Sequence, residues 1–261
     1  MRIGLLSADP GHPLLVATSR LLIDRGHRIE ILSPTAELPD DPADVYLLKA
    51  RTPAAIGLAR RLEQCGARVL NSAVATEFCQ DRVRMAVLAT AAGLPFAATT
   101  ALPNPRHLPV TVERALVVKS RHSRRGDLVA RVTDTAELDA VVRAWPDEPV
   151  VVQDLAPNSG WDHKIWVIGG TVCAALRRSE LVPGPRPADR PMADAPHADL
   201  ARRVGAVFGL DIYGVDVLEI HGEPLIVDVN AFPGVRGQES APEALAALVS
   251  STGPAATSAT G

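Results

Sequence analysis

Hydrophobic and polar positions in the first third of the chain alternate between short apolar runs and longer stretches with helical spacing. Leu14, Thr18 and Leu22 lie four residues apart, as on one face of a helix, and Pro13 and Gly26 suit its two ends. This alternation of strand and helix predicts a parallel sheet with helices on its faces. The predicted strands are 2–7, 28–33, 45–50 and 67–71, and the predicted helices are 13–26 and 54–66.

The pattern changes after one or two further helices over 72–93, and strands then follow one another with fewer helices between them. A hairpin over 163–179 is expected to turn at Gly169-Gly170, and the Pro-rich stretch 181–196 reads as a loop. We divide the chain into an N-terminal α/β domain (1–98), a central subdomain (99–155), a C-terminal subdomain (156–250) and a disordered tail (251–261). The other predicted strands are 115–120, 128–132, 150–155, 214–220 and 224–230, and the other helices are 135–145, 198–209 and 242–251.

Composition narrows the functional classes. The chain has 261 residues, of which 47% are hydrophobic, enough for a sizeable core. A net charge of −3 and an aromatic content of 3% give no support for a nucleic-acid or membrane partner. No GxGxxG supports a dinucleotide site. The three cysteines form no CxxC pair and suit a reducing compartment. The first apolar run is too short for a signal peptide, and we therefore expect a cytoplasmic protein.

Two acids on the last strand pair carry the strongest chemical signal. A hairpin loop centred on Gly222 places Asp216 directly opposite Asp228, with Cβ atoms roughly 5 Å apart. Adjacent carboxylates repel each other, and a divalent cation relieves that repulsion. Asn230 shares the face of Asp228 because residues two apart on a strand point the same way. The alternative is a strand end whose polar residues begin a turn. With few protein ligands, Mg²⁺ implies a phosphate-bearing nucleotide as well.

The segment GVDVLEIHGEPLIVDVNAFPG (214–234) resembles the closing motif of ATP-grasp enzymes, which hold ATP between two α+β subdomains. The resemblance extends upstream through VVK (117–119), VVQDL (151–155), DHKIWVIGG (162–170), RRS (177–179) and the entry segment 71–100, and covers roughly residues 45 to 240. It implies an ATP-grasp fold of mixed α/β and α+β class. Such a fold has an N-terminal parallel pre-ATP-grasp domain, a small central domain and a C-terminal antiparallel-sheet domain.

The resemblance also assigns roles to residues. It implies that Asp216, Asp228 and Asn230 bind Mg²⁺ or Mn²⁺, and that Arg177 and Lys164 act in catalysis. The nucleotide would be held by Lys119, Gly126, Gln153, Asp154, Leu155 and Lys164, with Leu155 contributing its backbone to adenine recognition.

Several of these residues have a structural alternative. Lys119 ends an apolar strand and could instead extend to water. A buried-facing Lys164 needs a partner, which could be a phosphate or a neighbouring acid. The basic loop 121–127 could close over the triphosphate or remain solvated. We expect His163 on the face opposite Lys164 in a structural or exposed position, the second arginine, Arg178, at the surface, and Glu219 and Glu223 in solvent.

Two branches of the superfamily match best. RimK-type ligases join an amino acid or peptide amine to a carboxylate through an acyl phosphate, and this is the function we predict. Inositol polyphosphate 5/6-kinases are the alternative, because Asp228 departs from the glutamate usual in ligases and matches the kinase motif. Arg82 replaces the usual lysine of an Asp-Lys pair, and ADRPM (188–192) lacks an asparagine common in ligases. A module that binds nucleotide without chemistry is a third hypothesis. The sequence leaves homo-oligomerisation open.

Overall fold

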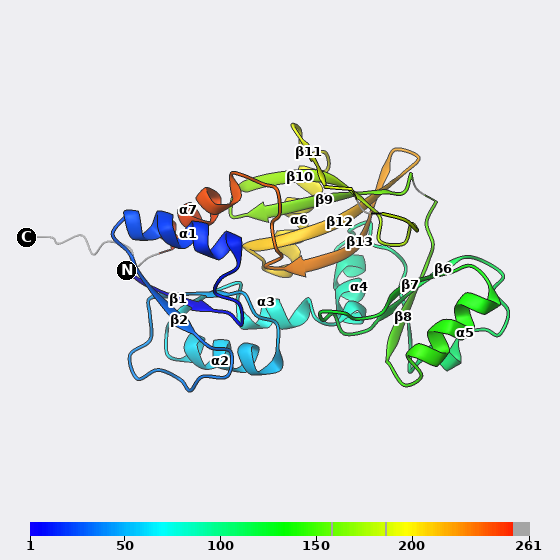
Figure 1. The fold of residues 1–261 in the computed structure, drawn as a ribbon, viewed down its shortest axis with the longest axis horizontal. Coiled ribbons are helices and arrows are strands. Elements are labelled where there is room, and N and C mark those ends of the chain that lie inside the picture. The colour runs from blue at the N-terminus through cyan, green and yellow to red at the C-terminus, as the bar shows by residue number, and fades with distance from the viewer. Residues whose placement is uncertain (158, 186, 253–261) are drawn as a thin grey trace, which may run out of the picture.

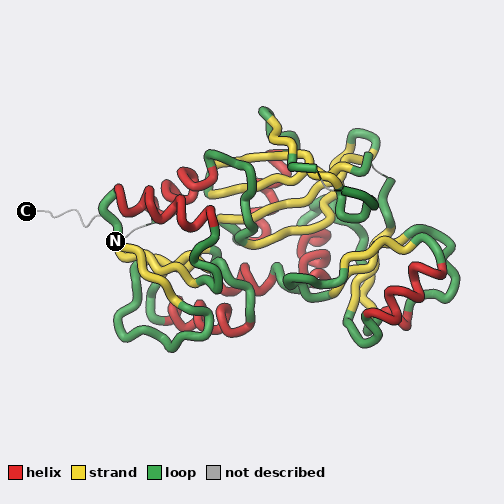
Figure 2. Tube along the Cα trace, in the orientation of Figure 1, coloured by secondary structure: helices red, strands yellow, loops and turns green. Residues whose placement is uncertain are grey.

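The computed structural model describes residues 1–157, 159–185 and 187–252. Three β-sheets lie along the long axis of the molecule, with the N-terminal sheet at one end and the small central sheet with α5 at the other (Figure 1). The largest sheet lies between them, and helices cover parts of all three (Figure 2). The mixed parallel and antiparallel sheets confirm the predicted fold class. Most of the predicted tail lies outside the described residues.

The N-terminal sheet is parallel, as the strand–helix alternation predicts. Its strand order is β2-β1-β3-β4. Thr52 begins α2 by accepting a hydrogen bond from the amide of Ala55, and Pro53 follows in the first turn. The elements are β1 (Arg2–Leu6), α1 (Pro13–Asp24), β2 (Arg28–Leu32), β3 (Val45–Leu48), α2 (Pro53–Gln64) and β4 (Arg68–Leu70).

Two helices, α3 (Ala73–Phe78) and α4 (Arg82–Ala91), fill the region predicted as one or two helices. Asp81 lies between them and begins α4. Its side chain accepts hydrogen bonds from amides in the first turn of α4 and so caps that helix. Both helices share a hydrophobic core with the C-terminal sheet, through residues such as Met85 and Ala89. The chain therefore packs against the C-terminal sheet before it enters the central sheet.

The central sheet is antiparallel, with strand order β5-β8-β6-β7, and α5 packs on one face through Leu138 and Val141. Three strands and the helix match the prediction, whereas β5 was not predicted. A 3₁₀ helix covers Pro105–His107. The elements are β5 (Thr100–Leu102), β6 (Leu116–Ser120), β7 (Val129–Val132), α5 (Thr135–Ala144) and β8 (Val150–Asp154).

The C-terminal sheet is also antiparallel, with strand order β11-β10-β9-β12-β13. The prediction of a loop over 181–196 is wrong at β11, which pairs with β10 at the sheet edge, where Pro191 is tolerated because an edge strand leaves one side unpaired. The elements are β9 (Trp161–Ile168), β10 (Thr171–Arg178), β11 (Arg190–Met192), α6 (Ala198–Phe208), β12 (Ile212–Ile220), β13 (Glu223–Ala231) and α7 (Ala241–Ser251).

Alternation along β9 gives this sheet two different faces. Ile165 and Val167 pack against α6, whereas Trp166 and Ile168 pack toward α7 and the N-terminal sheet. Since α3, α4 and α7 each pack at least partly against another predicted domain, the boundaries at residues 98 and 155 stay a prediction. Within the described ranges, no helix has the length and apolar character needed to span a membrane.

Candidate active site

The β12–β13 hairpin places Asp216 directly opposite Asp228, as the sequence predicts. The turn itself differs from the prediction, because it contains only His221 and Gly222. Both residues have positive φ, 54° and 86°, which is the backbone of a type I′ turn. A two-residue turn alone would offset the acids by one position.

A β-bulge at Val227 restores the predicted pairing. Val217 pairs with Ile226 while Asp216 pairs with Asp228, so Val227 is an extra residue without a cross-strand partner. Beyond the bulge the register continues regularly, and Asn230 lies opposite Gly214.

One cavity of about 820 Å³ collects nearly all the candidate residues. Gly126, whose φ of 73° suits a turn, is not among the described residues that line it. The predicted residues that do line it are Lys119, Gln153, Asp154, Leu155, Lys164, Arg177, Asp216, Asp228 and Asn230. Residues predicted from separate motifs therefore meet around one space of the size of a ligand pocket.

Each of the three predicted metal ligands on the hairpin faces a cation. Asp216 pairs with Lys164, so a neighbouring acid is the partner of that lysine in this structure. Asp228 lies 3.5 Å from Nη2 of Arg82, and Asn230 accepts a hydrogen bond of 3.5 Å from Arg51. Burial raises the pKa of Asp228, but the charges of Arg82, Lys119 and Lys164 outweigh it, so the pKa is lowered. The Asp228 carboxylate is therefore ionised.

Lys119 points into the site and does not extend to water. Its side chain is buried, and Nζ donates a hydrogen bond of 2.9 Å to the carbonyl oxygen of Val227 at the bulge. Burial lowers the pKa of Lys119, while the nearby charge of Asp228 acts in the opposite direction. A cation thus lies against the hairpin that carries the acid pair.

Asp162 is a site residue that the sequence analysis missed. It lies on β9 two positions before Lys164, and it lines the same cavity. Burial, and then the charge of Asp216, raise the pKa of Asp162 to about 6. Within the described chain its Oδ1 atom is buried and has no hydrogen-bond partner. The two-residue spacing from Lys164 was the signal that could have identified it.

The strand predicted to contact adenine is already hydrogen-bonded. Gln153 donates from Nε2 to the Thr99 hydroxyl at 3.0 Å, and the amide of Leu155 donates to the carbonyl of Ala115 at 3.0 Å. Asp154 is exposed and pairs with an arginine. The Leu155 amide would have to exchange its partner to bind a base, so its predicted role stays a prediction.

The basic loop 121–127 is tied to the protein by ion pairs. Arg121 contacts the helix cap Asp81 at 2.7 Å, and Arg124 contacts Glu148 at 2.6 Å. Asp127 accepts a 2.7 Å hydrogen bond from Arg82. Arg82 is itself buried and links this loop to the acid pair, a position that its sequence motif did not reveal.

The two arginines at the end of β10 both reach the cavity. Arg177 donates to the carboxylate of Asp189 at 3.1–3.3 Å. Burial lowers the pKa of Arg177, but the hydrogen bond that it donates to Asp189 leads the effects that raise the pKa, and the net shift is upward. The expectation that Arg178 lies at the surface is wrong, because it is half-buried and lines the same cavity.

Comparison with known proteins identifies a matching family and similar folds. The sequence model for the RimK-like ATP-grasp domain matches residues 85–247. A probable alpha-L-glutamate ligase 1 from Shewanella amazonensis is 26% identical, over 92% of this chain and 91% of its own length. A RimK-domain ATP-grasp protein from Sphaerobacter thermophilus superposes with a TM-score of 0.78 at 21% identity, covering 98% of this chain and all of that one. The ATP-grasp ligase PsnB, complexed with a precursor variant, Mg and ADP, gives a TM-score of 0.71 at 19% identity, covering 96% and 98% of the two chains.

Proposed function

The chain belongs to the RimK-like ATP-grasp family and is a ligase that forms carbon–nitrogen bonds, and we propose that it activates a carboxylate with ATP and transfers the acyl group to an amine. The observation that carries this proposal is the cavity wall formed by β9, β12 and β13. There, Asp216, Asp228 and Asn230 face a group of cations contributed by other elements. A cytoplasmic location stays a prediction.

The donor set fits Mg²⁺ or Mn²⁺. Two carboxylates and an amide oxygen line one wall, and hard divalent cations prefer oxygen ligands. Asp228 is ionised, as a metal ligand must be. When bound, the metal would neutralise charge on the β- and γ-phosphates. Asp216 would exchange Lys164 for the metal, which would free that ammonium for a phosphate.

Cations of the chain complete the phosphate site. Lys119 and Lys164 approach the acid pair from β6 and β9, and Arg177 lies at the end of β10. Arginine binds phosphate oxygens in a bidentate manner, and such donors stabilise charge that develops on a transferring phosphoryl group. These three residues would hold the γ-phosphate in line with the attacking carboxylate.

The proposed reaction has two steps. An oxygen of the substrate carboxylate attacks the γ-phosphorus, and the bond to the leaving ADP breaks, which gives an acyl phosphate. The amine nitrogen then attacks the acyl carbon, the carbon–oxygen bond to phosphate breaks, and the nitrogen loses a proton. No side-chain nucleophile is required. Cys79 is not a candidate for one, because it is buried and burial raises the pKa of its thiol to about 12.

Further arginines add to the basic lining of the cavity. Arg51 and Arg236 line it, as do Pro233 and Gly234. Two guanidinium groups suit a substrate that carries carboxylates in addition to the one activated. We therefore propose an acidic amino acid, such as glutamate, as one of the two substrates.

Product analysis tests the proposed function. Purified protein with ATP and Mg²⁺ should release phosphate only when a carboxylate substrate and a separate amine substrate are both supplied, with glutamate tested in each role, and mass spectrometry should show the amide that joins them. Transfer of phosphate to an alcohol acceptor would instead support a kinase. Tight ATP binding without turnover on any acceptor pair would support a binding module.

A further inference from the structure

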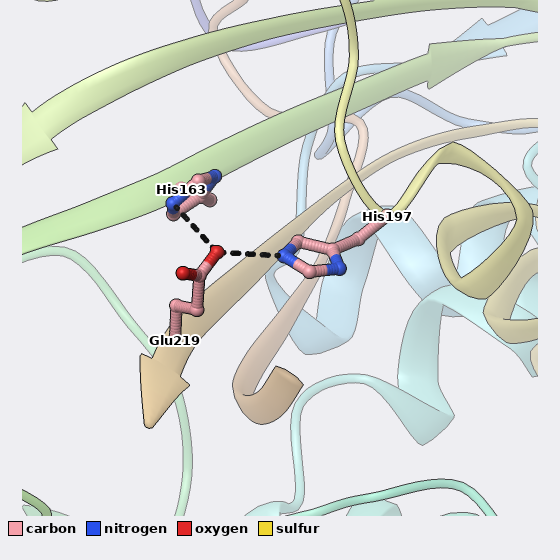
Figure 3. Close-up of side chains that lie close together, drawn as sticks. All are labelled: His163, His197 and Glu219. Carbon is pink, nitrogen blue, oxygen red and sulfur yellow. Dashed lines mark ion pairs between the residues drawn. The ribbon is translucent and has the colours of Figure 1, made fainter. Parts of the chain in front are cut away.

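A second cluster of ligand-type side chains lies on the opposite face of the C-terminal sheet from the cavity. His163 comes from β9, Glu219 from β12, and His197 from the residue preceding α6 (Figure 3). One ligand atom from each residue lies within 4.8 Å of the others. The expectation that Glu219 is merely solvated is incomplete, because its side chain is half-exposed yet points between two imidazoles.

Hydrogen bonding does not account for this arrangement. Oε2 of Glu219 lies 3.9 Å from Nε2 of His163 and 3.6 Å from Nε2 of His197, and both distances exceed those of a hydrogen bond. Within the described chain, Nε2 of His197, the nitrogen that faces Glu219, is buried and has no hydrogen-bond partner. Buried polar atoms without partners require an explanation.

The distances from the Glu219 oxygen to the two imidazole nitrogens are close to those expected between ligand atoms around a metal ion. Ligand bonds of about 2.0–2.1 Å at tetrahedral angles place neighbouring donor atoms roughly 3.3 Å apart, so small side-chain movements would close the site. Two imidazoles and one carboxylate are a typical donor set for Zn²⁺.

The surroundings leave room for a fourth ligand and hold His197 in place. A hollow of about 270 Å³ borders His163 and Glu219, and Trp161 and Arg190 also line it. His197 has φ 62° and ψ 21°, a left-handed conformation that is unfavourable for a non-glycine residue. A metal bond would compensate for this cost, because it anchors the entry to α6 on the sheet.

We propose that His163, His197 and Glu219 bind a borderline divalent transition-metal ion, represented by Zn²⁺, at a site separate from the magnesium site. The ion would join β9, β12 and the start of α6. Because β9 also carries Lys164 and β12 also carries Asp216, the bound metal would stabilise the two strands that support the cavity wall.

Isothermal titration of the full-length protein with Zn²⁺, in saturating Mg²⁺, tests this site. One Zn²⁺ per chain is expected. His197→Asn, which tolerates the left-handed backbone, and Glu219→Ala should each weaken the affinity at least tenfold. Co²⁺ in place of Zn²⁺ should give a visible tetrahedral absorption band that the same variants lose. Circular dichroism checks that each variant is folded.

Two controls separate this site from other Zn²⁺ binding. His221→Asn alters an exposed histidine at the tip of the same hairpin and should leave the affinity unchanged. Asp228→Asn should likewise leave it unchanged, because it affects only the magnesium site. Wild-type affinity in folded His197→Asn and Glu219→Ala, or loss of binding in Asp228→Asn alone, would overturn the proposal. The result does not depend on ligase activity.

Discussion

Asp216 and Asp228 face each other across the β12–β13 ladder, one residue from the bulge at Val227. The bulge gives the acids their register, and Lys119 holds it in place through a hydrogen bond to the Val227 carbonyl. Opposed carboxylates destabilise a strand pair unless a cation compensates. Lys164 and Arg82 provide that compensation in this structure, and we expect a metal to share the role in the working enzyme.

Replacing Asp228 with Asn should abolish turnover without unfolding the protein. The change removes one charged metal ligand, and phosphate release should fall at least 100-fold. Arg82 keeps its contacts with Asp127 and Ser120, so it is not left as an unpaired buried charge. Phosphate release and thermal unfolding measure the two effects. Glu223→Gln, an exposed change on the same hairpin, is the control, and unchanged turnover in Asp228→Asn would refute the metal role.

Metal removal should stop the reaction reversibly. Chelation with EDTA should reduce phosphate release to background, because the negative charge of the phosphates is then incompletely neutralised. Mg²⁺ or Mn²⁺ should each restore activity, since both accept oxygen ligands in octahedral geometry. Initial rates across a titration of each ion give the measurement. Full activity in EDTA would show that the oxygen cluster has another purpose.

The helices and long strands could be predicted because each carries its own periodic signal. β5 and β11 could not, since each has only three residues and forms through pairing with another strand across an intervening loop or set of elements. Pro191 also argues against a strand unless its edge position is known. The 11 residues that separate β10 from β11 (179–189) are rich in proline and give no sign that Arg190–Met192 would pair with β10.

The acid pair could be predicted from spacing, although the reasoning used the wrong turn. A three-residue loop and a two-residue turn with a bulge give the same opposition of Asp216 and Asp228, and nothing in the local sequence distinguishes them. Arg82 and Arg51 could not be assigned to the site, because they arrive from α4 and from the end of β3 through tertiary packing. Asp162 could have been found from its strand alternation.

Asp162 should make stability depend on pH when metal and nucleotide are absent. Its pKa is about 6 in the folded chain, against an ordinary aspartate pKa of 3.8, so the folded state binds more protons between these values. Stability should therefore fall as pH rises from about 4 to 6, and the full cost should persist above 6. Asp162→Asn removes this cost and should stabilise the protein by up to about 3 kcal/mol at pH 7.

Urea unfolding in EDTA at several pH values from 4 to 7 measures that difference. The gain from Asp162→Asn should be small at pH 4 and should approach its full value by pH 7. Asp139→Asn, at an exposed position on α5, is the control and should show no such trend. A gain that stays constant across the range would mean that the Asp162 carboxyl is not desolvated as the structure indicates.

Arg82→Lys tests whether the guanidinium fork connects the loop to the acid pair. Arg82 donates to the Ser120 carbonyl and to Asp127 at 2.7 Å each, and also lies beside Asp228. A lysine has one ammonium on a flexible stem and cannot reproduce this geometry. Loss of one buried charged hydrogen bond should cost about 1–3 kcal/mol in urea unfolding. Arg20→Lys, exposed on α1, should change little. Lysine is also the residue that usually follows aspartate in the Asp-Lys pair that Asp81 and Arg82 resemble. An unchanged or increased stability would therefore show that the contacts to Asp127 and Asp228 do not depend on the fork.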